Sequence, residues 1–368
     1  MIRLLFEYLQ AQGVDVGFFR LGGYLTFRII TAMVTSLLLM LLLGFRFIVF
    51  LYRHGMRDTS GDVVSIEAHG KRGTPTAGGL LVLLATTVSL LVWGDLHSPF
   101  LWWLGGGFLY LGLVGFLDDF QKVRFKSSLS GLSQAAKTLL MLVFLMPFAM
   151  HLVSAASPLP EELRPVLLVP FLKGVVLSLP PALFVVFAVL AMYAITNAVN
   201  ITDGLDGLLA GTAVPAIAVY VVLGYVLGNA ILSGYLLFPF IPGAGEIAVF
   251  GAAMIGALFG FLWFNTYPAE VFLGDTGSLA VGGGLAMMAF FTKQELLFLL
   301  AGGVFVFEIF TATVQQKVGD RMGRRIFHRA PFHHELTHRG MAEPKATVRL
   351  VIVSTLLSLI ALLSLKVR

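Results

Sequence analysis

Two adjacent carboxylates, Asp118 and Asp119, stand where a long apolar run gives way to a cationic stretch that ends at Lys126. At the C-terminal end of a helix such a pair is unfavourable, because the two charges repel each other and face the negative end of the helix dipole. A divalent cation, or a lysine that also faces a phosphate, would relieve both costs. The pair therefore indicates a site for a metal ion or a phosphate.

A second polar motif, NAVNITDGLDGL, carries Asn197, Asn200, Asp203 and Asp206 at every third position. Residues three apart are neighbours around a helical turn or a tight bend. Carboxylate and amide oxygens are suitable ligands for magnesium and hydrogen-bond partners for nucleotide hydroxyls. Helix capping by one of these acids is the alternative interpretation. Capping explains one acid but not two acids and two asparagines.

A third motif runs from Asn265 to Ser278 and includes Phe272 and Asp275. Asp275 precedes an apolar run, and the amino end of a helix attracts anions, so a metal ion held there could meet a phosphate. Phe272 offers an aromatic face on which a nucleotide base could stack. The alternative for Asp275 is again a helix cap.

Cations and hydroxyls accompany these acids. Lys71 and Thr76 lie in a glycine-rich stretch whose amides, hydroxyls and cations suit a phosphate. His333 and His334 follow several arginines and suit a pyrophosphate. The string HELTH at 334–338 has the letters of a zinc protease motif. Its place in a short cationic loop argues against zinc, because those cations would repel a divalent metal.

The elements that position these motifs are apolar. The chain has 368 residues, of which 58% are apolar and 12% charged, with no cysteine, and its mean hydropathy is +0.90. This composition excludes a soluble enzyme and a disulfide-stabilised chain. A membrane-spanning helix needs roughly 20 apolar residues. Runs of about that length fall at 22–51, 77–94, 100–117, 132–152, 176–196, 205–228, 246–264, 276–292, 295–316 and 347–366. The sequence predicts an all-α membrane protein of ten spans in a single domain, 1–368.

Charge orients these spans. Most of the 25 lysines and arginines lie in alternate connections, and the positive-inside rule then places those connections in the cytoplasm and both termini outside. The cytoplasmic connections are predicted at about 52–76, 118–131, 197–204, 265–275 and 317–346. Every motif described above lies in one of them or begins there. The net charge of +5 is thus assigned to these loops, and no nucleic-acid partner is expected.

One cytoplasmic site explains all the motifs together. Acids and amides indicate Mg²⁺, and the cations indicate a substrate with several negative charges. A site at the membrane face indicates one soluble and one lipid-borne substrate. The residues thus predict metal-dependent phosphoryl transfer from a soluble donor to a phospholipid-like acceptor. A secondary transporter is the alternative from another class, but its ionisable residues should lie at mid-membrane. Glu308 is the main such residue here.

Four segments resemble the polyprenyl-phosphate N-acetylhexosamine-1-phosphate transferase family. They are GTPTAGGL at 73–80, GFLDDFQK at 115–122, NAVNITDGLDGL at 197–208 and FNTYPAEVFLGDTGSLA at 264–280. APFHH at 330–334 and a last span ending in LKVR are similar to the branch of the family that transfers phospho-MurNAc-pentapeptide. The resemblance extends from about residue 20 to the C-terminus.

That branch of the family implies a multi-pass protein of the bacterial inner membrane, a homodimer, acting in peptidoglycan synthesis. UDP-MurNAc-pentapeptide would be the donor and undecaprenyl phosphate the acceptor, giving lipid I and UMP. Mg²⁺ would be the cofactor, with Mn²⁺ as a substitute. A related transferase that uses UDP-N-acetylglucosamine is the nearer alternative.

The resemblance also assigns residues. Those implied to be catalytic are Asp118, Asp119, Asp275, His333 and His334. Asp275 is the implied Mg²⁺ ligand, with Asp118, Asp119 and Asp203 as further candidates. The substrate-binding set, to which we add Lys126, is Lys71, Thr76, Lys126, Asn200, Asp203, Asp206, Asn265, Phe272, Ser278 and Gln315.

One position departs from the family. Where members commonly carry a third consecutive histidine, this chain has Glu335. Two mechanisms also stay open, because the lipid phosphate could attack the donor directly or an aspartate could attack first. We favour direct attack, since a phosphate is already a nucleophile and needs only positioning.

Overall fold

The computed structural model describes residues 1, 2, 8, 12, 21–57, 73–125, 131–172, 176–319, 321–323 and 325–366. Lys71 and Lys126, both predicted to bind substrate, lie outside the described residues. Within these residues the fold is mostly helical. The elements of its first half are α3 (Leu25–Arg53), α4 (Gly79–Trp93), α5 (Pro99–Arg124), α6 (Gln134–Val153), η3 (Glu161–Leu163), β1 (Val166–Leu168), β2 (Val176–Ser178) and α7 (Pro181–Ile201).

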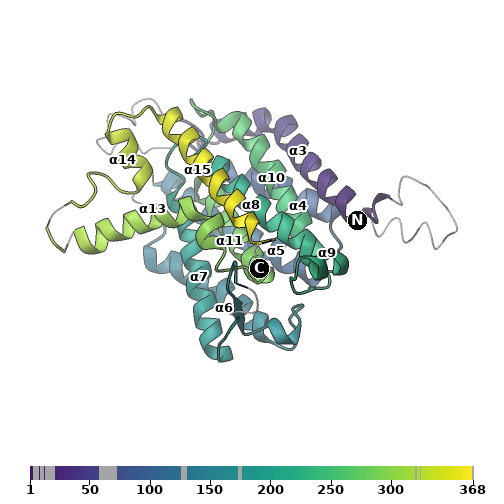
Figure 1. Ribbon diagram of the computed structural model, residues 1–368. Coiled ribbons are helices and arrows are strands. Elements are labelled where there is room, and N and C mark those ends of the chain that lie inside the picture. The colour runs from purple at the N-terminus through teal and green to yellow at the C-terminus, as the bar shows by residue number, and fades with distance from the viewer. Residues whose placement is uncertain are drawn as a thin grey trace.

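The second half is helical throughout its described residues (Figure 1). Its elements are α8 (Leu208–Leu227), α9 (Ala230–Tyr235), α10 (Gly245–Asn265), α11 (Gly274–Phe291), α12 (Phe298–Ala301), α13 (Gly303–Val314), η4 (Gln315–Gly319), α14 (Phe332–His338) and α15 (Glu343–Leu363). In Figure 1, α13 extends away from the main helical body on the side where α14 lies.

Seven helices in the described part of the chain are long and apolar enough to cross a membrane: α3, α5, α6, α7, α8, α10 and α15. The other three predicted spans are also helical. One is α4, with 15 residues, and one is α11, with 18. The third, predicted at 295–316, is divided at Gly302 into α12 and α13. The structure therefore agrees with an all-α membrane protein.

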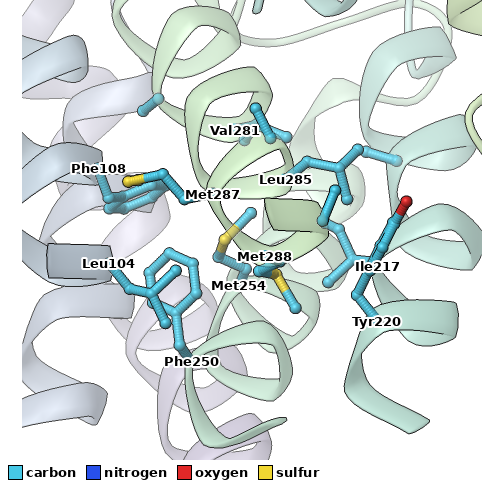
Figure 2. Packing of buried hydrophobic residues seen from close by; sticks show 14 of the residues in the cluster. Leu104, Phe108, Ile217, Tyr220, Phe250, Met254, Val281, Leu285, Met287 and Met288 are labelled. Carbon is cyan, nitrogen blue, oxygen red and sulfur yellow. The ribbon is translucent and has the colours of Figure 1, made fainter. Parts of the chain in front are cut away.

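The centre of the bundle is formed by α10 and α11. Helix α10 is mostly buried, because α3 and α8 pack along it. Helices α5 and α7 pack along α11. Phe108 of α5 and Phe250 of α10 meet edge to face with ring centroids 5.6 Å apart. Figure 2 shows these rings beside Met287 and Met254. Such dense packing of apolar side chains stabilises the positions of the helix ends.

Two helices continue into segments that the sequence assigns to loops. Helix α5 runs on to Arg124, so Asp118 and Asp119 lie on its last turns. Helix α7 runs to Ile201 and therefore carries Asn200. Side chains on a helix are held more rigidly than side chains on a loop, which suits a site that must keep fixed geometry.

The stretch between α6 and α7 forms a small surface element. Strands β1 and β2 pair antiparallel, with Leu167 opposite Leu177, and η3 precedes them. This element connects the C-terminal end of α6 to the N-terminal end of α7. Asp118 and Asn200 lie near the C-terminal ends of α5 and α7.

Candidate active site

The end of α5 holds the start of α11. One Asp119 oxygen accepts the backbone N–H of Asp275 at 3.0 Å. The other accepts the N–H of Thr276 at 2.9 Å and its hydroxyl at 2.6 Å. Asp119 therefore supplies the N-terminal cap of α11 from a neighbouring helix. Gly115 permits this approach, because a Cβ there would overlap the carbonyl of Asp275.

Asp118 and Asp275 share two lysines. Lys122 places its Nζ 2.6 Å from Asp118 Oδ2 and 2.9 Å from Asp275 Oδ2. Lys137, in the first turn of α6, places its Nζ 2.8 Å from the same Asp275 oxygen. Asp118 also accepts the backbone N–H of Leu132 at 2.8 Å. Helices α5 and α6 therefore both reach Asp275 at the start of α11.

Helix α7 completes this cluster. Asn200 Nδ2 donates to Asp275 Oδ1 at 2.6 Å and to Ser278 Oγ at 2.7 Å. Ser278 in turn donates to the carbonyl of Gly274 at 3.0 Å. These hydrogen bonds bring three of the predicted residues, Asn200, Asp275 and Ser278, into direct contact.

The cluster has the composition of a cation site. Asp118, Asp119 and Asp275 each offer a carboxylate oxygen, and these atoms lie within 4.8 Å of one another. Oxygen donors at this spacing fit a hard divalent cation. Among the described residues, three carboxylates share two ammonium groups, which leaves room for a metal ion to neutralise further negative charge.

The lysines also govern the protonation of Asp275. Burial opposes the charged form, but the ammonium groups of Lys137 and Lys122 outweigh burial and hold the pKa of Asp275 well below its usual range. Asp275 is therefore ionised at neutral pH, as a metal ligand must be.

A second group of predicted residues forms the adjoining framework. Asp206 accepts the backbone N–H of Ala269 at 3.0 Å. Asn265 accepts the N–H of Gly207 at 2.9 Å and donates to the carbonyl of Val271 at 2.8 Å. The bonds of Asp206 and Asn265 to main-chain groups hold the segment after α7 against the segment after α10.

The segment before α4 also joins the segment before α11. Phe272 donates its backbone N–H to Pro75 at 2.8 Å, and its carbonyl accepts the N–H of Gly78 at 2.8 Å. Thr76 is half-buried beside this pairing. Phe272 and Thr76 therefore lie near each other, and both keep partly exposed side chains.

The two histidines have different surroundings. His333 is fully buried, and its Nδ1 lies 3.1 Å from Glu308 Oε2. His334 is half-buried, with its ring centroid 4.2 Å from that of His333. Gln315 accepts the backbone N–H groups of Ile326 and Phe327 at 3.0 and 3.1 Å. Its amide oxygen thus organises the loop before α14.

Comparison with known proteins shows which family the chain resembles. Residues 101–293 match the model of glycosyl transferase family 4. The chain is 42% identical over 368 residues to the phospho-N-acetylmuramoyl-pentapeptide-transferase of Nitratidesulfovibrio vulgaris, covering 99% of this chain and 100% of the relative. The protein of the same name from Desulfosudis oleivorans is also 42% identical over 99% of this chain and 100% of the relative. The Methylacidiphilum infernorum protein of that name is 42% identical over 98% and 99%.

This chain belongs to the phospho-N-acetylmuramoyl-pentapeptide-transferase family. It is therefore an enzyme, a transferase of the glycosyl-1-phosphate class. The resemblance noted in the sequence is confirmed over the full length of the relatives. It covers the segments that carry Asp118, Asp119, Asp275 and His333.

Glu335, the departure from the family's histidine motif, has a role of its own in the loop. It accepts the backbone N–H of Arg329 at 2.9 Å and the Nε of Arg339 at 2.7 Å. The Arg329 N–H, together with Arg339 and His328, lowers the pKa of Glu335 to about 2 although burial opposes the shift. Glu335 is thus bound by cationic groups and is not free to act as the general base that a zinc protease motif requires of this position.

The sequence did not indicate that Lys122 and Lys137 bind Asp275, or that Glu308 contacts His333. Lys137 was visible as a lone cation at the start of the apolar run 132–152, but it was counted only toward topology. Among the predicted residues, Asp203 is half-buried after the last turn of α7, three positions beyond Asn200. The contact between Asn200 and Asp275 therefore brings this motif beside the acid cluster.

Proposed function

We propose that this protein transfers phospho-MurNAc-pentapeptide from UDP-MurNAc-pentapeptide to undecaprenyl phosphate, giving lipid I and UMP. The observation that carries the proposal is the buried group of Asp118, Asp119 and Asp275 with Lys122 and Lys137. Phosphoryl transfer depends on positioning and on neutralising phosphate charge. A metal ion and two ammonium groups can do both.

The membrane setting of the proposal has ten spans, with both termini outside and the site on the cytoplasmic face of the bacterial inner membrane. The seven long apolar helices support the multi-pass part of this arrangement. The concentration of cations in alternate connections supports the orientation. A soluble nucleotide donor and a lipid phosphate would meet at this face. We also expect a homodimer, as in the family.

Mg²⁺ is the proposed cofactor. Asp275 would hold it, with Asp118 as the second ligand, because the oxygens of Asp119 already bind the start of α11. When bound, the ion would neutralise phosphate oxygens of the donor. Lys122 and Lys137 then remain to bind the other phosphate oxygens.

Direct attack is the proposed course of the reaction. An oxygen of undecaprenyl phosphate forms a bond to the β-phosphorus of the donor. The bond from that phosphorus to the bridging oxygen breaks, and the oxygen leaves with UMP. Oδ2 of Asp118 and Nζ of Lys122 lie 2.6 Å apart, and these two groups would orient the attacking phosphate. Asp119 acts by holding α11.

Purified protein with Mg²⁺, undecaprenyl phosphate and single UDP-sugars tests this function. We expect UMP release only with UDP-MurNAc-pentapeptide. Release with UDP-N-acetylglucosamine instead would assign the chain to the related transferases. No release from any donor, by protein that is folded, would exclude the enzyme and favour a transporter.

The course of the reaction needs a separate test. Rapid quenching of the enzyme with donor alone should leave no sugar phosphate on the protein. A phosphosugar trapped on Asp118 or Asp119 would replace direct attack with a two-step mechanism.

A further inference from the structure

A row of side chains after α13 takes no part in the proposed reaction. It consists of three pairs, each with a cation followed by an apolar residue, at every fourth position: Lys317 and Val318, Arg321 and Met322, Arg325 and Ile326. We call these six side chains the loop surface. The three cations are exposed, and the three apolar side chains are 44%, 53% and 42% exposed. Exposed apolar side chains beside exposed cations indicate a partner that is both apolar and anionic.

The backbone of the loop surface is held in place. Met322 donates its backbone N–H to the carbonyl of Val318 at 2.9 Å, so these two residues lie one helical turn apart. Farther along the chain, Ile326 donates its N–H to Gln315 Oε1 at 3.0 Å. These bonds fix the backbone at both ends of the loop surface.

The loop surface continues the apolar side of α13. Figure 1 shows α13 extending away from the main helical body, so lipid can reach its sides. Phe307 and Phe310 of this helix are 45% and 57% exposed. Val314 and Val318 follow at intervals of four residues, which places them on the same side of the helix as Phe310. The exposed apolar side of α13 therefore extends into the loop surface.

The cations of the loop surface are available to an anion. The Arg325 guanidinium donates to the carbonyl of His328 at 2.9 Å, which uses one of its five N–H groups. In the described part of the chain, Lys317, Arg321 and Arg325 form no ion pair. Glu335, the next described carboxylate along the chain, is already bound by other cations. An anionic headgroup would supply a counter-charge to these three side chains.

Anionic phospholipid fits both halves of this surface. Lysines and arginines near an anionic bilayer are attracted to its headgroups, and apolar side chains on the same segment enter the boundary between headgroups and acyl chains. An acidic soluble protein would pair with the cations but would not cover an apolar side that continues a membrane helix. Undecaprenyl phosphate would offer a single phosphate, whereas three separate cations are exposed here.

We propose that the loop surface is a binding site for anionic phospholipid. Its three cations bind headgroup phosphates, and its three apolar side chains enter the edge of the acyl-chain region. The site is separate from the acid cluster, where Lys122 and Lys137 contact Asp275 and would bind the substrate phosphates. The proposal goes beyond the transfer reaction and requires neither of its substrates.

Native mass spectrometry of the purified full chain tests the site. The chain in neutral detergent is titrated with phosphatidylglycerol, which is anionic, and separately with phosphatidylcholine, which is zwitterionic. We expect the first phosphatidylglycerol to bind at least about tenfold more tightly, because each cation near the headgroups contributes roughly a fivefold gain in affinity. Equal affinity for the two lipids would overturn the proposal and favour an acidic protein as the partner.

Lys317→Gln combined with Arg321→Gln is the decisive variant. Both side chains are exposed, so the protein should fold normally. Loss of two cations should weaken the binding of phosphatidylglycerol roughly 30-fold and change that of phosphatidylcholine by less than about twofold.

Lys345→Gln combined with Arg349→Gln is the matched control. It removes a lysine and an arginine at the same spacing, and both are exposed. The residue that follows each of them is buried, so they lack the adjoining exposed apolar side chains. This variant should bind phosphatidylglycerol within about twofold of the wild type. Equal losses in the two double variants would show that only net charge matters and would overturn the site.

Val318→Ser combined with Met322→Ser tests the apolar half. Binding of phosphatidylglycerol should weaken roughly tenfold, because less apolar surface enters the lipid. The remaining binding should be more sensitive to sodium chloride than that of the wild type, since salt screens charges but not apolar contacts. Unchanged binding would contradict the proposed insertion of these side chains.

Enzyme kinetics separates this lipid site from a substrate site. In neutral detergent without phospholipid, Lys317→Gln combined with Arg321→Gln should keep the KM values for UDP-MurNAc-pentapeptide and undecaprenyl phosphate within about threefold of the wild type. A rise of about tenfold or more in either KM would assign the cations to a substrate phosphate and overturn the proposal. A wild-type protein that releases no UMP would count against the proposed function alone, because the lipid titration needs no turnover.

Discussion

Two buried ionic clusters lie near opposite ends of the helical body, and they are built differently. Near the start of α3, Arg28 donates to Glu246 at 2.6 Å and to the carbonyl of Trp93 at 2.6 Å. The backbone N–H of Asp95 donates to the same carboxylate at 2.8 Å. One guanidinium therefore meets one carboxylate, and the main chain adds one hydrogen bond to each of them.

In the cluster at the other end, the negative and positive charges are not equal in number among the described residues. Among the described residues, Lys122 and Lys137 are the cations that face Asp118, Asp119 and Asp275. A buried pair needs matched charge to offset the desolvation of both ions. A cluster with surplus charge is stable only if something else supplies the missing cation. The balanced pair thus serves to join helices, whereas the unbalanced group is arranged to receive a ligand.

The largest expected effect is on catalysis in the unbalanced cluster. Asp275→Asn removes the charge that the metal ion and both lysines share, and should reduce UMP release at least about 1,000-fold. The unfolding temperature of Asp275→Asn in detergent should fall far less than that of a variant that breaks the pair of Arg28 and Glu246. A variant with near wild-type activity would show that surplus charge is unrelated to function here.

Glu246→Gln tests the balanced pair. It leaves the Arg28 guanidinium buried without a counter-charge, which is destabilising by about 3–5 kcal/mol. Denaturant unfolding should show that loss, whereas UMP release per folded molecule should stay within about twofold. The exposed Glu161 offers a control, since Glu161→Gln should change neither property. Loss of activity comparable with Asp275→Asn would contradict the distinction.

Lys137→Gln should have a smaller catalytic effect than Asp275→Asn. Its Nζ lies 2.8 Å from Asp275 and would bind a phosphate oxygen, so we expect roughly a 100-fold lower rate of UMP release. Lys345 is an exposed lysine at the start of α15, and Lys345→Gln should be as active as the wild type. Equal activity of the two variants would remove Lys137 from the site.

The smallest effect is expected at Glu335 and depends on pH. Its pKa is lowered from 4.5 to about 2 in the folded protein, so its contribution to stability is complete above about pH 4.5 and is lost as the pH falls toward 2. The unfolding temperatures of wild type and Glu335→Gln should therefore differ at pH 6, approach each other as the pH falls below 4.5, and converge near pH 2. A constant difference across this range would argue against the hydrogen bonds described here.

Much of the site could be predicted from single segments. Asp118, Asn200 and Asp275 are unusual in their own stretches, because polar residues beside a membrane span are rarely without function. The apolar runs predicted helices at every span. The sequence pattern did not predict which contacts each of these side chains makes. Asp119 was expected to bind metal or act in catalysis, and the structure uses both its oxygens to cap α11.

The sequence by itself determined the class of molecule, the polar motifs at its helix ends and the family they resemble, because these are properties of composition and local order. Only the tertiary structure decided that Lys137 meets Asp275 and that Glu308 holds His333. Those contacts join different helices, and hydrophobic periodicity does not specify which helix ends come together. The packing of α5, α7 and α11 determines which ends meet. That packing also turns separate motifs into one charged site.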